Sequence, residues 1–143
     1  MAAELSPGVR LFWKIHPWVY RATRGRIGGN LLGMPVLLLT TQGRRSGEPR
    51  RTALTYLPWE GRYVVIASYL GQPRHPAWWL NLAANPQATV QIGSRHEIVK
   101  AREALGPERE RIWNAVVERV SDYADYAKRT ERRIPVVVLQ PEA

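Results

Sequence analysis

The chain has 143 residues, of which 45% are hydrophobic and 23% charged, the balance of one globular domain. It contains no cysteine, which excludes disulfides, thiolate nucleophiles and cysteine-ligated metal sites. Its three histidines and two aspartates do not follow metal-ligand spacings, and its apolar runs are shorter than a membrane span. We therefore expect no bound metal and a cytoplasmic protein.

Basic residues outnumber acidic ones by 21 to 12, which gives a formal net charge of +9. All the basic residues except Lys14, Lys100 and Lys128 are arginines. A planar guanidinium matches phosphate and carboxylate groups better than a point charge does. The composition leaves two interpretations open: a genome-wide bias toward arginine, or a polyanionic partner such as a nucleic acid, an anionic membrane or a phosphorylated cofactor.

Residues 1–30 form a basic and aromatic N-terminal arm, and residues 31–143 form the remaining domain. Residues 1–26 contain five basic residues and one acidic residue, a net charge of +4, with aromatic side chains among them. Such a segment can lie on an anionic membrane surface, which would place the protein at the inner face of the membrane. Pro17 would interrupt a helix there, and packing of the arm on its own domain is the alternative.

The chain after the arm consists of short apolar segments separated by turns. Their lengths and flanking glycines and prolines predict strands at residues 34–41, 51–58, 62–69, 88–92, 96–103 and 134–139. The second and third are expected to form a hairpin around residues 59–61. Because most neighbouring strands are joined by short turns, the sequence predicts an α+β fold whose mostly antiparallel sheet closes into a small barrel.

Three helices are predicted between these strands. Pro76 suits the first turn of a helix at residues 77–84, and Pro107 begins a longer helix with an apolar stripe that includes Ile112 and Val116. A short third helix carries Tyr123 and Tyr126, which are three residues apart and therefore on one face.

Several segments could form a ligand site. The turn at residues 43–51 contains four arginines, one serine and two glycines, so its backbone N–H groups and guanidinium groups could hold an anion. Trp78 and Trp79 point in different directions on their helix, so one can pack in the core while the other lines a groove. Ser68 ends an apolar strand and could donate a hydrogen bond to a ligand. A solvated basic hairpin and ordinary core packing are the corresponding alternatives.

Three motifs in this order are similar to those of the deazaflavin-dependent nitroreductases: GRRSGEPRR at residues 43–51, PAWWLNLAANP at 76–86 and DYADYAKRTERRIPVVVLQP at 122–141. The resemblance covers residues 34–141. It implies a split β-barrel related to FMN-binding flavoproteins, with about six mostly antiparallel strands and two or three helices. It also implies coenzyme F420, a deazaflavin with an anionic phosphodiester and polyglutamyl tail, as the cofactor bound by residues 31–143.

The same resemblance implies roles for individual residues. The phosphate and the tail carboxylates would be held by Arg44, Arg45, Ser46 and Arg50. The backbone along the cofactor would be that of Arg51, Thr52, Ala53, Leu54 and Thr55. The deazaflavin ring would be bordered by Ile66, Ala67, Ser68 and Tyr69, and closed on its other side by Ala77, Trp78, Trp79, Leu80 and Asn81. The catalytic residues would be Ser68, Tyr123 and Tyr126, with a tyrosine assisting proton delivery.

The expected function is that of an F420H2-dependent oxidoreductase, a monomer or homodimer that passes a hydride from the reduced deazaflavin to an electrophilic acceptor such as a quinone. Val120 stands where drug-activating relatives have a further tyrosine, so we expect an apolar pocket wall that favours quinones over nitroaromatic compounds. The alternatives are an FMN-binding split-barrel reductase and a non-enzymatic basic module for membranes or nucleic acid. The last does not explain the paired tryptophans, and nucleic acid is not the expected partner.

Overall fold

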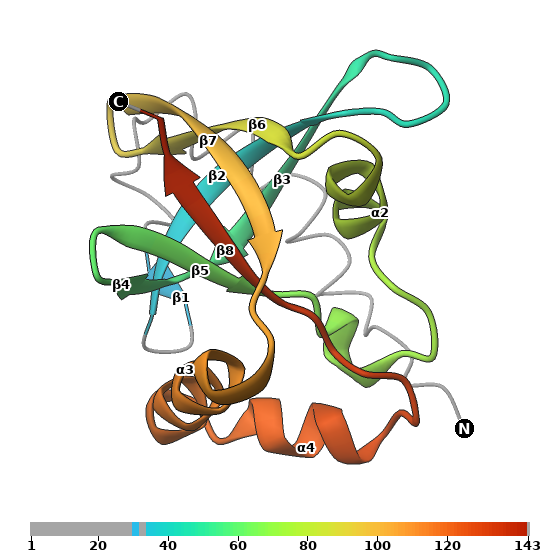
Figure 1. Cartoon of the computed structure of the whole chain (residues 1–143), viewed down its shortest axis with the longest axis vertical. Helices are drawn as coiled ribbons and strands as arrows, with labels where there is room; N and C mark the ends of the chain where they lie inside the picture. Colours follow the sequence, from blue (N-terminus) through green and yellow to red (C-terminus); the bar gives the residue numbers. More distant parts are fainter. Residues whose placement is uncertain (1–29, 32–33, 143) are drawn as a thin grey trace.

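The structure is a computed structural model that describes residues 30–31 and 34–142. In this part of the chain, eight strands form one antiparallel sheet that curls on itself, and helices cover its ends (Figure 1). The strands are β1 (Asn30–Leu31), β2 (Met34–Gln42), β3 (Pro49–Thr55), β4 (Leu57–Trp59), β5 (Arg62–Ile66), β6 (Gln87–Ile92), β7 (Arg95–Glu103) and β8 (Val136–Pro141). The helices are the short 3-10 helix η1 (Tyr69–Gly71) and α2 (Ala77–Ala84), α3 (Gly106–Arg119) and α4 (Asp122–Lys128).

The strand order explains how the sheet closes. The strands follow the order β1-β2-β6-β7-β8-β5-β4, and β3 pairs with the other edge of β2. β3 and β4 therefore lie toward opposite ends of the sheet, yet they are consecutive in the chain and are joined at Tyr56. The backbone N–H of Tyr56 donates to the carbonyl oxygen of Pro35 at 2.9 Å. This connection draws the two ends together, and it confirms the split β-barrel expected from the sequence.

One predicted hairpin is confirmed only in its second half, where β4 and β5 pair around Glu60 and Gly61. Residues 51–58 were expected to pair as one strand with residues 62–69, but β3 pairs along its length with β2, and only β4 pairs with β5. The break at Tyr56 divides the segment because its two halves serve opposite ends of the barrel. The third predicted strand also ends early, at Ile66, since Tyr69 and Gly71 adopt φ angles of +46° and +77°, which are not extended. The short strands β1 and β4 bring the number to eight instead of six.

Both faces of the curled sheet are buried in part. One face carries an apolar cluster that includes Leu37 of β2, Val90 of β6 and Leu139 of β8. The opposite face of β5 and β8 packs against α3 and α4 through residues such as Ile112 and Val116. The predicted apolar stripe of α3 is thus confirmed, and its burial attaches the α3–α4 pair to the barrel.

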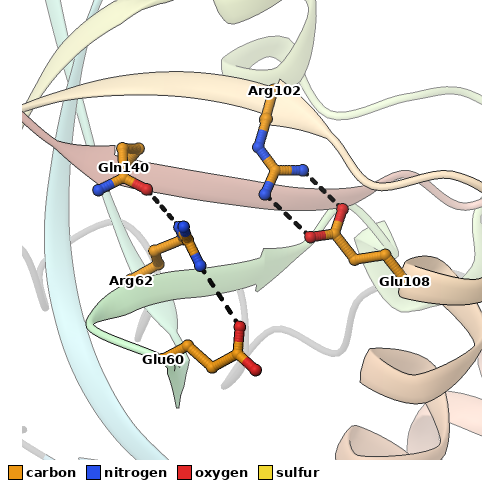
Figure 2. Close-up of polar contacts among 5 residues, drawn as sticks. All are labelled: Glu60, Arg62, Arg102, Glu108 and Gln140. Carbon is orange, nitrogen blue, oxygen red and sulfur yellow. Dashed lines mark hydrogen bonds and ion pairs between the residues drawn. The ribbon is translucent and has the colours of Figure 1, made fainter.

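Polar contacts on the surface attach α3 to the sheet and join neighbouring strands. Arg102 of β7 forms two hydrogen bonds, 2.6 and 2.9 Å long, with the carboxylate of Glu108 in the first turn of α3 (Figure 2). This pairing raises the pKa of Arg102 and lowers that of Glu108. Arg62 of β5 similarly donates to Gln140 of β8 and pairs with Glu60 (Figure 2). The first pair fixes the start of α3 on the sheet, and α3 in turn positions α4.

Candidate functional site

A cavity of about 630 Å³ lies along β3, a volume typical of small-molecule sites. Every residue of β3 from Arg50 to Thr55 lines it. Because successive side chains of a strand point to opposite faces, this continuous lining means that the cavity follows the edge of the strand. Among the described residues β3 pairs only with β2, so its other edge offers backbone N–H and C=O groups to a ligand.

The turn between β2 and β3 forms one end of the cavity and is tightly closed. The N–H of Gly43 donates to the carbonyl of Glu48, and the N–H of Gly47 donates to the carbonyl of Gly43, each at 2.8 Å. A Cβ atom on Gly43 would lie 2.8 Å from Ser46 Oγ, so only glycine fits there without a shift. Gly47 has a φ of +75°, which also favours glycine. Figure 1 shows this turn projecting from the sheet on the side of α2.

Asn81 of α2 anchors this turn. Its Oδ1 accepts hydrogen bonds from the backbone N–H of Arg44 at 3.2 Å and from Arg44 Nη1 at 3.0 Å, while its Nδ2 donates to Thr41 Oγ1 at 3.1 Å. Asn81 and Thr41 are both buried. The amide that was expected to contact the cofactor is therefore occupied in holding the basic turn against α2.

The remaining arginines of the turn are available to a ligand. Arg45, Arg50 and Arg51 line the cavity and are exposed. Within residues 30–31 and 34–142, none of them forms an ion pair, and Arg50 donates only a long hydrogen bond of 3.5 Å to Ser46 Oγ. Three uncompensated guanidinium groups create a strong positive potential at this end of the cavity.

The other end of the cavity is apolar and aromatic. It is formed by the β5–α2 loop (residues 67–76), by Trp78 at the start of α2 and by α4. Gly71 brings the loop and α4 into contact, because a Cβ atom on Gly71 would lie 2.8 Å from the carbonyl oxygen of Tyr126. The guanidinium group of Arg132 donates hydrogen bonds to backbone carbonyl groups of the loop, including that of Ser68 at 2.8 Å. Sequence reasoning did not identify Arg132, which lies far along the chain from the loop.

Two tyrosines of α4 complete this end. The rings of Tyr123 and Tyr126 meet edge to face, with their centroids 5.7 Å apart. Tyr123 is buried, and its hydroxyl group shares a 2.8 Å hydrogen bond with Thr55 Oγ1. Burial raises the pKa of Tyr123, and burial followed by the charge of Asp122 raises the pKa of Tyr126. Both phenols therefore keep their protons at neutral pH and can act as hydrogen-bond donors.

Most of the expected site residues meet in this one cavity. Three do not line it: Ala67 is fully buried, Trp79 packs against the barrel core, and Leu80 is half-buried on α2. Three further residues line it, namely Thr41, Gly43 of the basic turn and Pro76. The prediction that Val120 forms a pocket wall is wrong, because Val120 ends α3 and lies in the core between the helices and the sheet. No group of three or more acidic or histidine side chains that could hold a metal ion occurs in the described ranges.

Known proteins match most of this chain. The model of the F420H(2)-dependent quinone reductase family matches residues 12–141. An F420H(2)-dependent quinone reductase of Mycobacterium tuberculosis is 41% identical over 140 residues, which cover 95% of this chain and 93% of that protein.

Two of the solved structures that resemble this one are similar in sequence as well. The first, described as an F420-H2 dependent reductase (FDR-A), is 40% identical with a TM-score of 0.68 and covers 74% of this chain and 94% of its own. The second, described as a domain-swapped dimer, is 34% identical with a TM-score of 0.70 and covers 94% of this chain and 100% of its own. Since the segment matched by the family contains every element that lines the cavity, this chain belongs to the F420H(2)-dependent quinone reductase family.

Proposed function

We propose that this protein is an F420H2-dependent reductase that delivers a hydride to a quinone or a similar flat electrophile. The observation that carries the proposal is the asymmetry of the cavity. One end presents Arg45, Arg50 and Arg51 without acidic partners in the described part of the chain, and the other end is apolar and aromatic. A long ligand with an anionic tail and a flat ring fits this division.

Coenzyme F420 has these two parts. The exposed arginines of the turn would hold its phosphodiester and tail carboxylates through charge-assisted hydrogen bonds. The open edge of β3 would bind it through backbone groups, and the ring would lie between the β5–α2 loop and Trp78. When bound in its reduced form, the cofactor supplies the hydride from its C5 atom, while the protein supplies orientation and exclusion of water.

The protein's own contribution to the chemistry is hydrogen bonding at the ring end. Tyr126 lines the cavity, and no hydrogen bond to its hydroxyl oxygen is formed within residues 34–142, so that phenol can donate to an acceptor oxygen that becomes negative. Tyr123 is committed to Thr55 and joins α4 to β3. Ser68 could hydrogen-bond the ring or the acceptor. Because Val120 does not reach the cavity, the preference for flat quinones over nitroimidazoles rests on the apolar walls formed by Ile66 and the tyrosines.

A binding titration of the purified protein with F420, FMN, FAD and NADPH tests the proposal. We expect F420 to bind most tightly and its reduced form to reduce a quinone such as menadione, with little nitroimidazole turnover and no activity with NADPH alone. Preferential binding of FMN would favour the flavin-dependent alternative. Binding of none of the four, with strongly salt-dependent binding to DNA, would favour a non-enzymatic basic module.

The relative described as a domain-swapped dimer supports a homodimer for this chain, which sedimentation equilibrium would test.

The division into an arm (residues 1–30) and a cofactor-binding domain (residues 31–143) is also part of the proposal. So is contact of residues 1–26 with the anionic inner face of the membrane. The arm lies almost entirely outside the described residues. In the described ranges, no helix is both long and apolar enough to cross a bilayer.

A further inference from the structure

The guanidinium of Arg132 holds the β5–α2 loop at four points. Its Nε donates to the carbonyl of Gln72 at 2.9 Å, its Nη1 to the carbonyl of Ala67 at 3.2 Å, and its Nη2 to the carbonyl of Ser68 at 2.8 Å. The fourth contact is between Nη1 and His75 Nδ1 at 3.1 Å. A single side chain from the segment after α4 therefore joins both ends of the loop.

The loop needs such support. Tyr69, which lines the cavity, has a φ of +46°. This conformation costs a non-glycine residue free energy and persists only where surrounding contacts offset that cost. Within the loop itself, the N–H of Gly71 donates to the carbonyl of Ser68 at 2.9 Å and the N–H of Gln72 to that of Tyr69 at 3.1 Å. The Ser68 carbonyl thus serves both this turn and Arg132.

The contact with His75 sets a condition on the proton of that histidine. Arginine has donors and no acceptor, so His75 Nδ1 must accept, which requires a neutral ring with its proton on Nε2. A protonated ring would place a second N–H and a like charge against the guanidinium. Burial and then the charge of Arg132 lower the pKa of His75, Arg133 acts in the same direction, and Glu103 opposes them.

We propose that Arg132 is a positioning residue for the ring end of the cavity, and that its hold on the β5–α2 loop weakens when His75 becomes protonated. The inference rests on the proposed function, because the loop carries Ser68 and Tyr69 into the wall of the cofactor cavity. The direction of the pH effect follows from linkage. A histidine whose pKa is lower in the folded state contributes fully above its ordinary value of 6.5, and this contribution is lost as the pH falls through the lower folded value.

The first test needs no cofactor. Hydrogen exchange of the Gly71 and Gln72 amides is followed by NMR at about pH 7.5 and about pH 5, as protection factors that remove the intrinsic pH dependence of exchange. We expect the protection to fall about tenfold at the lower pH, the scale of one charge-assisted hydrogen bond. The amide of Val120, bonded to Val116 in α3, should keep its protection and report that the fold is intact.

Substitution of the histidine provides the decisive comparison. His75→Asn places an amide oxygen at the same distance along the side chain as Nδ1, so an acceptor is kept and the titration is removed. The variant should keep its loop protection at both pH values. Its affinity for F420 should not weaken at the lower pH, whereas we expect that of the wild type to weaken. His96→Asn, at an exposed site on β7, is the matched control and should behave as the wild type.

Substitution of the arginine tests the positioning role. Arg132→Lys keeps the charge but cannot reach all four acceptors, so loop protection should fall at both pH values and F420 binding should weaken about tenfold. The adjacent Arg133→Lys, which affects an exposed pair with Glu103, should change neither.

Two results would overturn the proposal: loop protection that does not change with pH in the wild type, or a His75→Asn variant that loses protection as the wild type does. Failure of the proposed function gives a different result, in which F420 does not bind while the loop exchange follows His75.

Discussion

Arg45 is an exposed guanidinium at the basic end of the cavity, and its charge is not neutralised by any acidic side chain in the described ranges. Arg45→Ala should weaken F420 binding by about 1.5–3 kcal/mol, because one charge-assisted contact with the anionic tail is lost. The loss should become smaller as salt is raised, since exposed charges are screened. A fluorescence titration at several salt concentrations measures both effects.

The matched control is Arg119→Ala, an exposed arginine at the end of α3 that does not line the cavity. An equal loss of affinity in both variants would show that the effect comes from overall charge, and an unchanged affinity in Arg45→Ala would remove the turn from the cofactor site.

Tyr126 and Tyr123 differ in what their hydroxyl groups do. Tyr126→Phe should lower kcat about 10²-fold if its phenol is the proton donor. Tyr123→Phe should chiefly lower the free energy of unfolding, by about 1–2 kcal/mol, because Thr55 loses its buried partner. Steady-state kinetics and chemical denaturation separate the two outcomes. Wild-type kcat in Tyr126→Phe would transfer proton delivery to Ser68 or to water.

The pH dependence that the two phenols give to the wild-type protein has a defined sign. The pKa of each phenol is raised above 10.0 by burial, so the donor stays protonated as the pH rises from 7 to 9. Stability linked to these groups is complete below 10.0 and is lost as the pH rises through the higher folded values. A fall in kcat between about pH 7 and pH 9 would therefore have to come from another group.

At the scale of elements, the close approach of η1 to α4 depends on Gly71. Gly71→Ala would place Cβ 2.8 Å from the carbonyl of Tyr126 and 2.9 Å from Cβ of Arg129, so α4 must shift. We expect a loss of about 1–3 kcal/mol in the free energy of unfolding, together with weaker F420 binding. Thermal denaturation and a cofactor titration measure the two effects.

Gly61 is a matched control for this substitution. Its φ of +76° is nearly the same as that of Gly71, but a Cβ atom there would have no neighbour within 4 Å. Gly61→Ala should therefore show only the cost of the backbone conformation, about 1 kcal/mol, with unchanged cofactor affinity. If the two variants were equally destabilised, the contact between η1 and α4 would not be tight.

The sequence predicted the helices and strands well wherever a local pattern defines them. Apolar runs bounded by turn residues located most of the strands, and Pro107 and the stripe at Ile112 located α3. The division of the segment at Tyr56 could not be predicted, because the pairing of β3 and β4 depends on strands from both ends of the barrel. The assignment of Val120 to the cavity came from the comparison with drug-activating relatives, and it failed because Val120, directly after α3, packs in the core against the sheet.

At the scale of the whole molecule, the cavity is assembled from segments that are distant in the chain. Asn81 fixes a turn 37 residues away, and Tyr123 joins a strand 68 residues away through Thr55. The motifs identified which segments belong together, whereas contacts such as those of Arg132 follow only from the closed barrel. The family resemblance therefore brought together residues that spacing alone could not relate.

Residues 1–26 of the N-terminal arm contribute a charge of +4 to the net charge of +9. If residues 1–26 bind an anionic surface, the full chain should sediment with phosphatidylglycerol-containing liposomes at low salt and not with neutral ones. A variant in which the five basic residues of the arm are replaced by glutamine should lose this binding and keep its affinity for F420. The basic residues concerned are Arg10, Lys14, Arg21, Arg24 and Arg26.

The comparison variant carries Arg111→Gln and Arg119→Gln on the exposed side of α3, away from the cavity. It should still sediment, because each basic residue near an anionic surface adds only about 1 kcal/mol and those of the arm are kept. Sedimentation that survives neutralisation of the arm would assign the membrane contact to the arginines of the barrel. If the full chain does not sediment with anionic liposomes even at low salt, the arm has no membrane role, and its basic residues must be explained within the protein itself.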